Sequence, residues 1–194
     1  MAVAVKLIVG LLSPAGDAAT FGWARGRIAE AFGAIEREYG PYPFDYTDYY
    51  REISRCLERR FFSFTELRHP FGLVAWKKRA VEMEAESAGA AGAGRRVNVD
   101  PGYVDGARLV LASTKDNAHR VYLYDDIYAE VTLCRRKTGW ERFSYTFPDF
   151  ASGIYDGFLD AVRTDWRADI RKQRGERCVD REVQHRRHAS DLVG

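Results

Sequence analysis

Apolar side chains dominate residues 3–12 almost without interruption, a pattern typical of a strand that is buried on both faces of its sheet. A looser alternation over residues 34–39 and an aromatic run over residues 57–64 predict two more strands. Residues 17–32 carry an imperfect apolar stripe at helical spacing, with Asp17 in position to cap the helix. The chain is therefore expected to begin with a strand, a helix and two further strands.

A second helix and a fourth strand are predicted next. Residues 70–86 place apolar positions three and four apart, and Pro70 suits a first helical turn. Residues 96–99 predict a short strand that ends at the Pro-Gly pair 101–102. This order over the first hundred residues predicts the α+β class, with a ferredoxin-like βαββαβ core.

The rest of the chain is expected to extend this core. Two apolar runs, 121–124 and 127–133, flank a two-residue turn and predict a β-hairpin. Residues 105–112 are predicted to form a helix. Residues 155–170 repeat apolar side chains every three or four positions, which predicts a C-terminal helix.

The length and composition of the chain favour one domain. Its 194 residues are 46% hydrophobic and can bury a single sizeable core, so we expect one α+β domain over residues 1–171. Residues 87–94, SAGAAGAG, predict a flexible loop inside that domain. Residues 172–194 contain few, unspaced apolar side chains, which predicts a basic, disordered tail.

The net charge of +2 is too small to indicate a nucleic-acid partner by itself. The three cysteines lie far apart in no metal-binding pattern, and their odd number argues against a disulfide framework. The apolar run at residues 7–12 is shorter than the core of a signal peptide and far shorter than a membrane span. We therefore expect a cytoplasmic protein without a membrane partner.

Polar side chains of the kinds used in binding sites gather between residues 95 and 132. Asn98 and Asp100 alternate with valines, so both point to one face of their strand, and Arg96 lies beside them. These three residues are candidate ligand-binding groups. Asp100 stands before Pro-Gly, however, where it is also an ordinary turn residue.

Residues 113–120, STKDNAHR, concentrate hydroxyl, cationic, carboxylate and imidazole groups. Lys115 and Arg120 would hold a phosphate or carboxylate, arginine through two parallel hydrogen bonds and lysine as a point charge. His119 would act as a general acid or base near neutral pH, with Asp116 as a second catalytic candidate. The alternative is a solvated loop with one surface histidine.

Glu130 is the third catalytic candidate. It shares one face of its predicted strand with Tyr128 and Thr132. If that face lines a cavity with His119 or Lys115, Glu130 is a candidate base or metal ligand whose pKa burial would raise. If the face is exposed, Glu130 is a surface carboxylate, and the sequence leaves both alternatives open.

Asp45 and Asp48 are candidate metal ligands. With Thr47 between them, they would offer oxygen atoms to a hard divalent cation such as Mg²⁺, which would then be the cofactor. The alternative is that Asp45 or Thr47 caps a short helix that begins near Asp48.

Five strings carry a resemblance to a known family: PYPFDYTDYYREI, RRFFSFTEL, RRVNVDPGYV, LVLASTKDNAHRVYL and IYAEVTL. In these strings, which occur in family order, the chain resembles DUF4416, a bacterial and archaeal family of unknown function. The likeness covers about residues 5 to 170. Members of this family are often labelled GTP-binding, so the resemblance adds a nucleotide to the candidate ligands.

The residues can be compared with what that label requires. A phosphate-binding loop of the form GxxxxGK[ST] does not occur in the chain. The guanine-reading Asn/Thr-Lys-x-Asp pattern is approached by residues 114–117, TKDN, but the acid stands one position too early. An ordinary GTPase is therefore not expected.

Three functions are compatible with these patterns. The first is binding of a small phosphorylated or carboxylated ligand, with a divalent cation as an optional partner; whether the chain is an enzyme stays open, because spacing pairs no nucleophile with a base. The second is nucleic-acid binding, through a ferredoxin-like sheet and the basic residues 163–187. The third is an adaptor without catalysis that uses exposed tyrosines such as Tyr46, Tyr49 and Tyr50.

Overall fold

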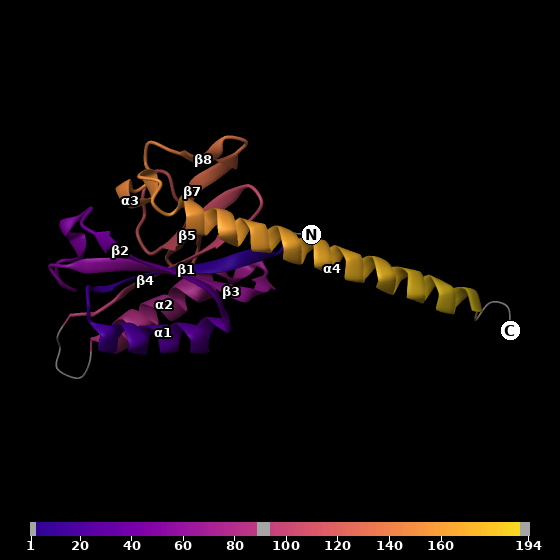
Figure 1. The fold of residues 1–194 in the computed structure, drawn as a ribbon, viewed down its shortest axis with the longest axis horizontal. Coiled ribbons are helices and arrows are strands. Elements are labelled where there is room, and N and C mark those ends of the chain that lie inside the picture. The colour runs from indigo at the N-terminus through magenta and orange to yellow at the C-terminus, as the bar shows by residue number, and fades with distance from the viewer. Residues whose placement is uncertain (1–2, 89–93, 191–194) are drawn as a thin grey trace.

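One antiparallel sheet with helices on both faces organises the protein (Figure 1). The computed structural model describes residues 3–88 and 94–190, with side chains as far as residue 175. The strands are β1 (Val5–Pro14), β2 (Ile35–Phe44), β3 (Leu57–Arg68), β4 (Asn98–Val104), β5 (Arg108–Ser113), β6 (Val121–Tyr124), β7 (Ile127–Arg136) and β8 (Gly139–Arg142). The helices are α1 (Ala18–Phe32), α2 (Leu73–Ser87), α3 (Pro148–Ala151) and α4 (Asp156–Ser190), with single 3₁₀ turns η1 (Asp48–Tyr50) and η2 (Pro70–Gly72).

The eight strands run in the order β2-β3-β1-β4-β5-β7-β6, and β8 pairs with β7 off this path. Every neighbouring pair is antiparallel. The predicted class, helices combined with an antiparallel sheet, is confirmed. The sheet does not stop at β4, however, but continues through β5 and β7 to β6, so it is larger than a four-stranded core.

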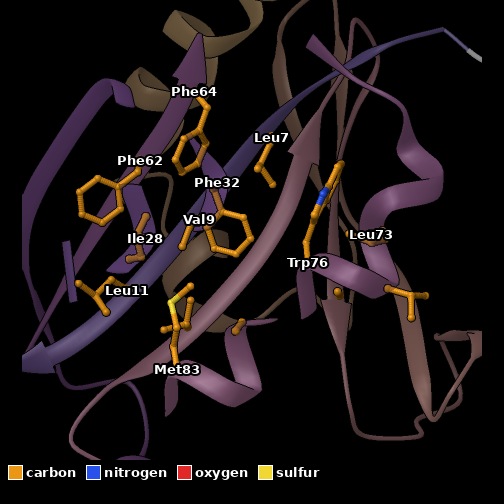
Figure 2. Packing of buried hydrophobic residues seen from close by; sticks show 14 of the residues in the cluster. Leu7, Val9, Leu11, Ile28, Phe32, Phe62, Phe64, Leu73, Trp76 and Met83 are labelled. Atoms are coloured by element: carbon orange, nitrogen blue, oxygen red, sulfur yellow. The ribbon is translucent and has the colours of Figure 1, made fainter. Parts of the chain in front are cut away.

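The central strand β1 is buried on both of its faces, as its continuous apolar sequence predicts. Leu7, Val9 and Leu11 point to one side and join the larger hydrophobic cluster (Figure 2). Ile8 points to the other side and joins a second cluster. This alternation positions β1 as the support for two helical layers.

Helices α1 and α2 cover the first face of the sheet (Figure 1). Ile28 and Phe32 of α1 and Trp76 and Met83 of α2 pack with the β1 side chains (Figure 2). Asp17 caps α1 by accepting a hydrogen bond from the Thr20 backbone N–H at 3.0 Å. The helical spacing and the cap in the sequence therefore both correspond to real features.

The start of α4 covers the second face. Phe158, Leu159 and Val162 are fully buried there, and Phe158 stacks on Phe61 of β3 with ring centroids 5.2 Å apart. Farther along, α4 extends beyond the sheet (Figure 1). In the part of the chain that the structure describes, no helix is long and apolar enough to cross a membrane.

The predicted helix over residues 105–112 is wrong, because residues 108–113 form strand β5. Asp105 does accept hydrogen bonds from the backbone of Ala107 and Arg108, as a helix cap would. These hydrogen bonds instead stabilise the turn between β4 and β5. Pairing of β5 with β4 on one side and β7 on the other decides the conformation, which local spacing could not show.

The predicted tail also differs from the structure, which continues α4 to Ser190 without a break at residue 172. Arg, Lys, Gln and Glu are good helix formers, so a helix that leaves the core does not need apolar spacing to continue. Residues 191–194 lie outside the described residues, as do residues 89–93, which make up most of the predicted loop 87–94.

Strands β4 and β5 approach closely at Gly102. A methyl group there would overlap the carbonyl oxygen of Val110 and the side chain of Leu111. We expect Gly102→Ala to lower the free energy of unfolding by about 1–3 kcal/mol, measured by urea denaturation. Gly22→Ala, in helix α1 with open space around it, is the control and should be neutral or slightly stabilising. Equal stability of both variants would contradict this packing.

Candidate functional site

A cavity of about 450 Å³ opens between two groups of elements. Residues of β3, β4, α2 and η1 line one part of it, and residues of β5, β7 and the segment 113–120 line the other. Ligand pockets in proteins typically measure about 300–1,000 Å³. The cavity is therefore large enough for a metabolite.

Arg59 of β3 forms the floor of the first part and is only 3% exposed. Its Nη1 donates to the Asp100 carboxylate at 3.0 Å, and its Nη2 lies 3.7 Å from Asp149. Gly10 of β1 makes room for this side chain, since a Cβ there would be 3.1 Å from Arg59 Nη1. One buried cation thus interacts with two carboxylates of the cavity wall.

Lys77 of α2 approaches the same carboxylate from the neighbouring helix. Its ammonium donates to the Val99 carbonyl oxygen at 2.9 Å and to Asp100 at 3.5 Å. Burial by itself would raise the pKa of Asp100, but Lys77 and Arg59 outweigh it and leave that pKa below its usual range. Asp100 is therefore held ionised inside the protein.

The network continues through Glu84, Arg95 and Asn98, which also line the cavity. Glu84 accepts a hydrogen bond from the Val99 backbone N–H at 2.9 Å and pairs with Arg95. Asn98 accepts from Arg95 at 3.0 Å and donates to Asp100 at 2.7 Å. Burial raises the pKa of Glu84, and the nearby Lys77 only partly opposes this.

Asp149, at the start of α3, is fully buried. Its carboxylate accepts hydrogen bonds from the Phe150 backbone N–H at 2.8 Å and from the Tyr155 hydroxyl at 3.1 Å. Burial raises the pKa of Asp149 even though Arg59 opposes the shift. Hydrogen bonds from the protein, rather than from water, therefore stabilise Asp149 as a second carboxylate in the cavity wall.

Glu130 of β7 organises the second part of the cavity. This residue is buried, and its Oε2 lies 3.0 Å from His119 Nε2 and accepts from Arg120 Nε at 3.0 Å. The polar face of β7 thus lines the cavity together with His119, which was one of the two alternatives for Glu130.

The ring of His119 lies parallel to that of Tyr145, with centroids 4.3 Å apart and an interplanar angle of 6°. The Tyr145 hydroxyl donates to the Val131 carbonyl oxygen at 3.1 Å, which anchors the stack to β7. In the described part of the chain His119 Nδ1 makes no hydrogen bond. The imidazole is therefore held in place through one nitrogen and keeps the other free.

Arg120 is fixed by three acceptors. Besides Glu130, its Nη1 donates to the Ser113 hydroxyl at 2.8 Å and to the Lys115 carbonyl oxygen at 3.0 Å. Its Nη2 has no hydrogen-bond partner among the described residues. One arm of a rigid guanidinium is therefore available to a ligand.

Lys115 contacts η1 at the cavity. Its ammonium sits 3.4 Å from the centroid of the Tyr49 ring, a cation–π contact between the two sides. Within residues 3–88 and 94–175, no carboxylate lies within ion-pair distance of this ammonium. Lys115 thus carries an uncompensated positive charge at the cavity.

Six of the residues predicted from the sequence line this cavity: Asn98, Asp100, Lys115, His119, Arg120 and Glu130. Two others do not. Arg96 is exposed and pairs with Asp17 at 2.8 Å on the α1 cap, and Asp116 is exposed outside the cavity lining.

The proposed metal ligands Asp45 and Asp48 also lie outside the cavity lining. Asp48 is 78% exposed and pairs with Arg51 at 2.7 Å. Thr47 instead caps η1 by accepting from the Tyr49 backbone N–H at 3.1 Å, which is the alternative that the sequence left open. No group of three His, Cys, Asp or Glu side chains within the described residues is arranged to hold a metal ion.

Sequence reasoning missed several cavity residues, namely Arg59, Lys77, Glu84, Arg95 and Asp149. A signal for two of them exists. Lys77 and Glu84 occupy the same stripe of α2 as buried apolar residues, and both are buried. A charge on the apolar face of a helix indicates an internal ionic site, because an unpaired charge is costly to bury.

These observations define a mixed α/β protein with a charged cavity beside its central sheet. The family model described as "Domain of unknown function (DUF4416)" matches residues 3–166, and the chain belongs to this family. Among the curated proteins and the solved structures, none matches the chain.

Proposed function

We propose that the cavity binds a small phosphorylated or carboxylated ligand, and that Lys115 and Arg120 hold its anionic group. The observation that carries this proposal is the uncompensated charge of Lys115. The other Lys and Arg side chains of the cavity lining each pair with a carboxylate, as for Arg59, Lys77, Arg95 and Arg120. An anionic ligand would supply the partner that Lys115 lacks among the described residues.

The position of Arg120 supports the same ligand chemistry. Its guanidinium is oriented by Glu130 and Ser113 before any ligand arrives, so little conformational entropy is lost on binding. A phosphate or carboxylate oxygen would accept from the free Nη2. Lys115, with three rotatable N–H donors, would contact the same group as a point charge.

His119 is the group that we propose for proton exchange with the bound ligand. Glu130 orients it through Nε2, and the stack on Tyr145 restrains the ring. The free Nδ1 would accept or donate the proton, since imidazole does either near neutral pH. Asp116 has no part in this proposal, because it lies outside the cavity lining.

Two broader expectations belong to the same proposal. The order β2-β3-β1-β4, with antiparallel neighbours and helices α1 and α2 in the connections, supports a ferredoxin-like description of the first part of the chain. Cys56 and Cys134 are free thiols, which supports a reducing compartment, the cytoplasm.

The test is thermal unfolding of the purified protein against inorganic phosphate, carboxylated and phosphorylated metabolites, and nucleotides, each with and without Mg²⁺. An anion at about one hundred times its dissociation constant should add roughly 2.7 kcal/mol to the free energy of unfolding, a shift of several degrees. The matched controls are analogues in which the anionic group is replaced by an amide or a hydroxyl. Failure of every anion to stabilise the protein would reject the proposal.

A further inference from the structure

Strand β6 forms an outer edge of the sheet and presents an apolar surface to solvent. Its only strand partner among the described residues is β7. All four of its side chains, Val121 to Tyr124, are between 37% and 67% exposed, and none is charged. Edge strands of monomeric proteins are usually protected by charges, prolines or bulges, because an unprotected edge pairs with other strands. β6 has an irregular register with β7 between Tyr122 and Tyr124, but it carries neither a charge nor a proline.

A neighbouring residue enlarges this apolar surface. Phe71 of η2 is 74% exposed, and its ring stacks on that of Tyr124 with centroids 6.2 Å apart. Phe71 and the four β6 side chains together expose roughly 500 Å² per chain. Complete burial on two chains would remove at most about 1,000 Å² from solvent, which is near the lower limit of a specific interface.

The charges around β6 favour one orientation of a second strand. Asp125 and Asp126 follow β6 directly in the turn to β7, and both are exposed. Lys78 pairs with Asp125 at 2.9 Å, so among the described residues the unpaired negative charge of the turn is that of Asp126. A parallel copy of the strand would bring the two acidic turns side by side. An antiparallel copy places them at opposite ends of the paired strands, so the repulsion is avoided.

We propose that β6 pairs antiparallel with β6 of a second copy of this chain, about a two-fold axis, and joins the two sheets into one. The partner is a second copy because β6 offers the same uncharged surface to itself, as an isologous interface requires. Phe71 of each copy covers the apolar side chains beside the new strand pair. This inference is independent of the ligand proposed for the cavity.

The test is sedimentation velocity over a roughly hundredfold range of protein concentration. Wild type should change from the mass of one chain to twice that mass as concentration rises. Val121→Lys combined with Leu123→Lys should sediment as a monomer throughout, because the lysines add two positive charges to the edge strand of each copy. Far-UV circular dichroism and the unfolding temperature should match those of wild type, since both side chains are exposed.

The control is Ile154→Lys, which places the same charge on another exposed apolar residue, one at 44% exposure between α3 and α4. It should dimerise like wild type. Should the double variant fail to fold, Val121→Lys alone, at the most exposed β6 position, should weaken the dimer at least about tenfold. A monomeric wild type at every concentration, or unchanged dimerisation of the folded lysine variants, overturns the proposal.

Discussion

Replacing Arg59 by methionine is expected to lower the free energy of unfolding by about 3–5 kcal/mol, because it removes the cation from the fully buried Asp149 and from the half-buried Asp100. Asp149 is fully buried and 3.7 Å from Arg59, and Asp100 accepts a hydrogen bond from the same guanidinium. Methionine has a similar volume and is apolar, so lost packing accounts for only a small part of the effect. Urea denaturation followed by circular dichroism measures the change.

Arg60→Met is the matched control for Arg59→Met. Arg60 is the next residue of β3, points to the other face of the sheet and packs its guanidinium over the Phe21 ring at 4.1 Å. It pairs with Glu58 at 3.1 Å near the surface, so its loss should cost only about 0–1 kcal/mol. Equal losses of unfolding free energy in the two variants would show that the buried ion network stabilises the protein no more than a surface ion pair does.

Replacing Lys115 by methionine is expected to weaken binding of the anionic ligand by about 10–100-fold, which corresponds to one lost hydrogen bond to a charged group. The free energy of unfolding should fall by no more than about 1 kcal/mol, because Lys115 is exposed, has no ion pair among the described residues and loses only its contact with the Tyr49 ring. Isothermal titration of the anion that stabilises wild type most measures this change.

Two comparisons make the Lys115 result specific. Lys137→Met removes another exposed lysine, in the turn between β7 and β8 outside the cavity lining, and should bind like wild type. Tyr49→Leu removes the ring below the Lys115 ammonium but leaves the charge, so it should retain more affinity than Lys115→Met. Equal weakening by the two lysine variants would indicate general attraction of the anion rather than a site.

The parts of the fold that could be predicted from sequence are those in which one periodicity spans a whole element. β1 has a continuous apolar run, and α4 begins with a stripe of apolar residues that covers one face of the sheet. β5 was predicted as a helix because its six residues are too few to establish a period, and its pairing partners lie far away in the sequence. Pairing with β4 and β7 therefore determines the strand conformation of that segment.

The site residues likewise divide into those that the sequence pattern indicates and those that only the fold reveals. Asn98, Lys115, His119 and Arg120 stand out in the sequence because they gather in short polar segments between apolar runs, and these segments do reach the cavity. Arg59 lies in a charged and aromatic strand in which several residues have similar character. Only the path of β3 beside β1, with space left by Gly10, shows that this arginine is the buried one.

The buried ions also explain how the fold would prepare the cavity for an anion. Asp100, Glu84 and Glu130 each bind cations of the protein, so no carboxylate of this group is left to repel a negatively charged ligand. The strong pairs immobilise the walls, whereas the Lys115 ammonium, among the residues that the structure describes, contacts only the face of an aromatic ring. Of the cavity side chains, Lys115 is therefore expected to change its contacts most when the ligand binds.

The most direct test of the proposed site is amide chemical-shift mapping by NMR, with the anion that stabilises the protein most. We predict shifts concentrated in residues 113–120, with smaller ones around Asn98 to Asp100 and Glu130, and their loss in Lys115→Met. Shifts confined to α4, or spread over exposed lysines and arginines with no preference for the cavity, would contradict the account.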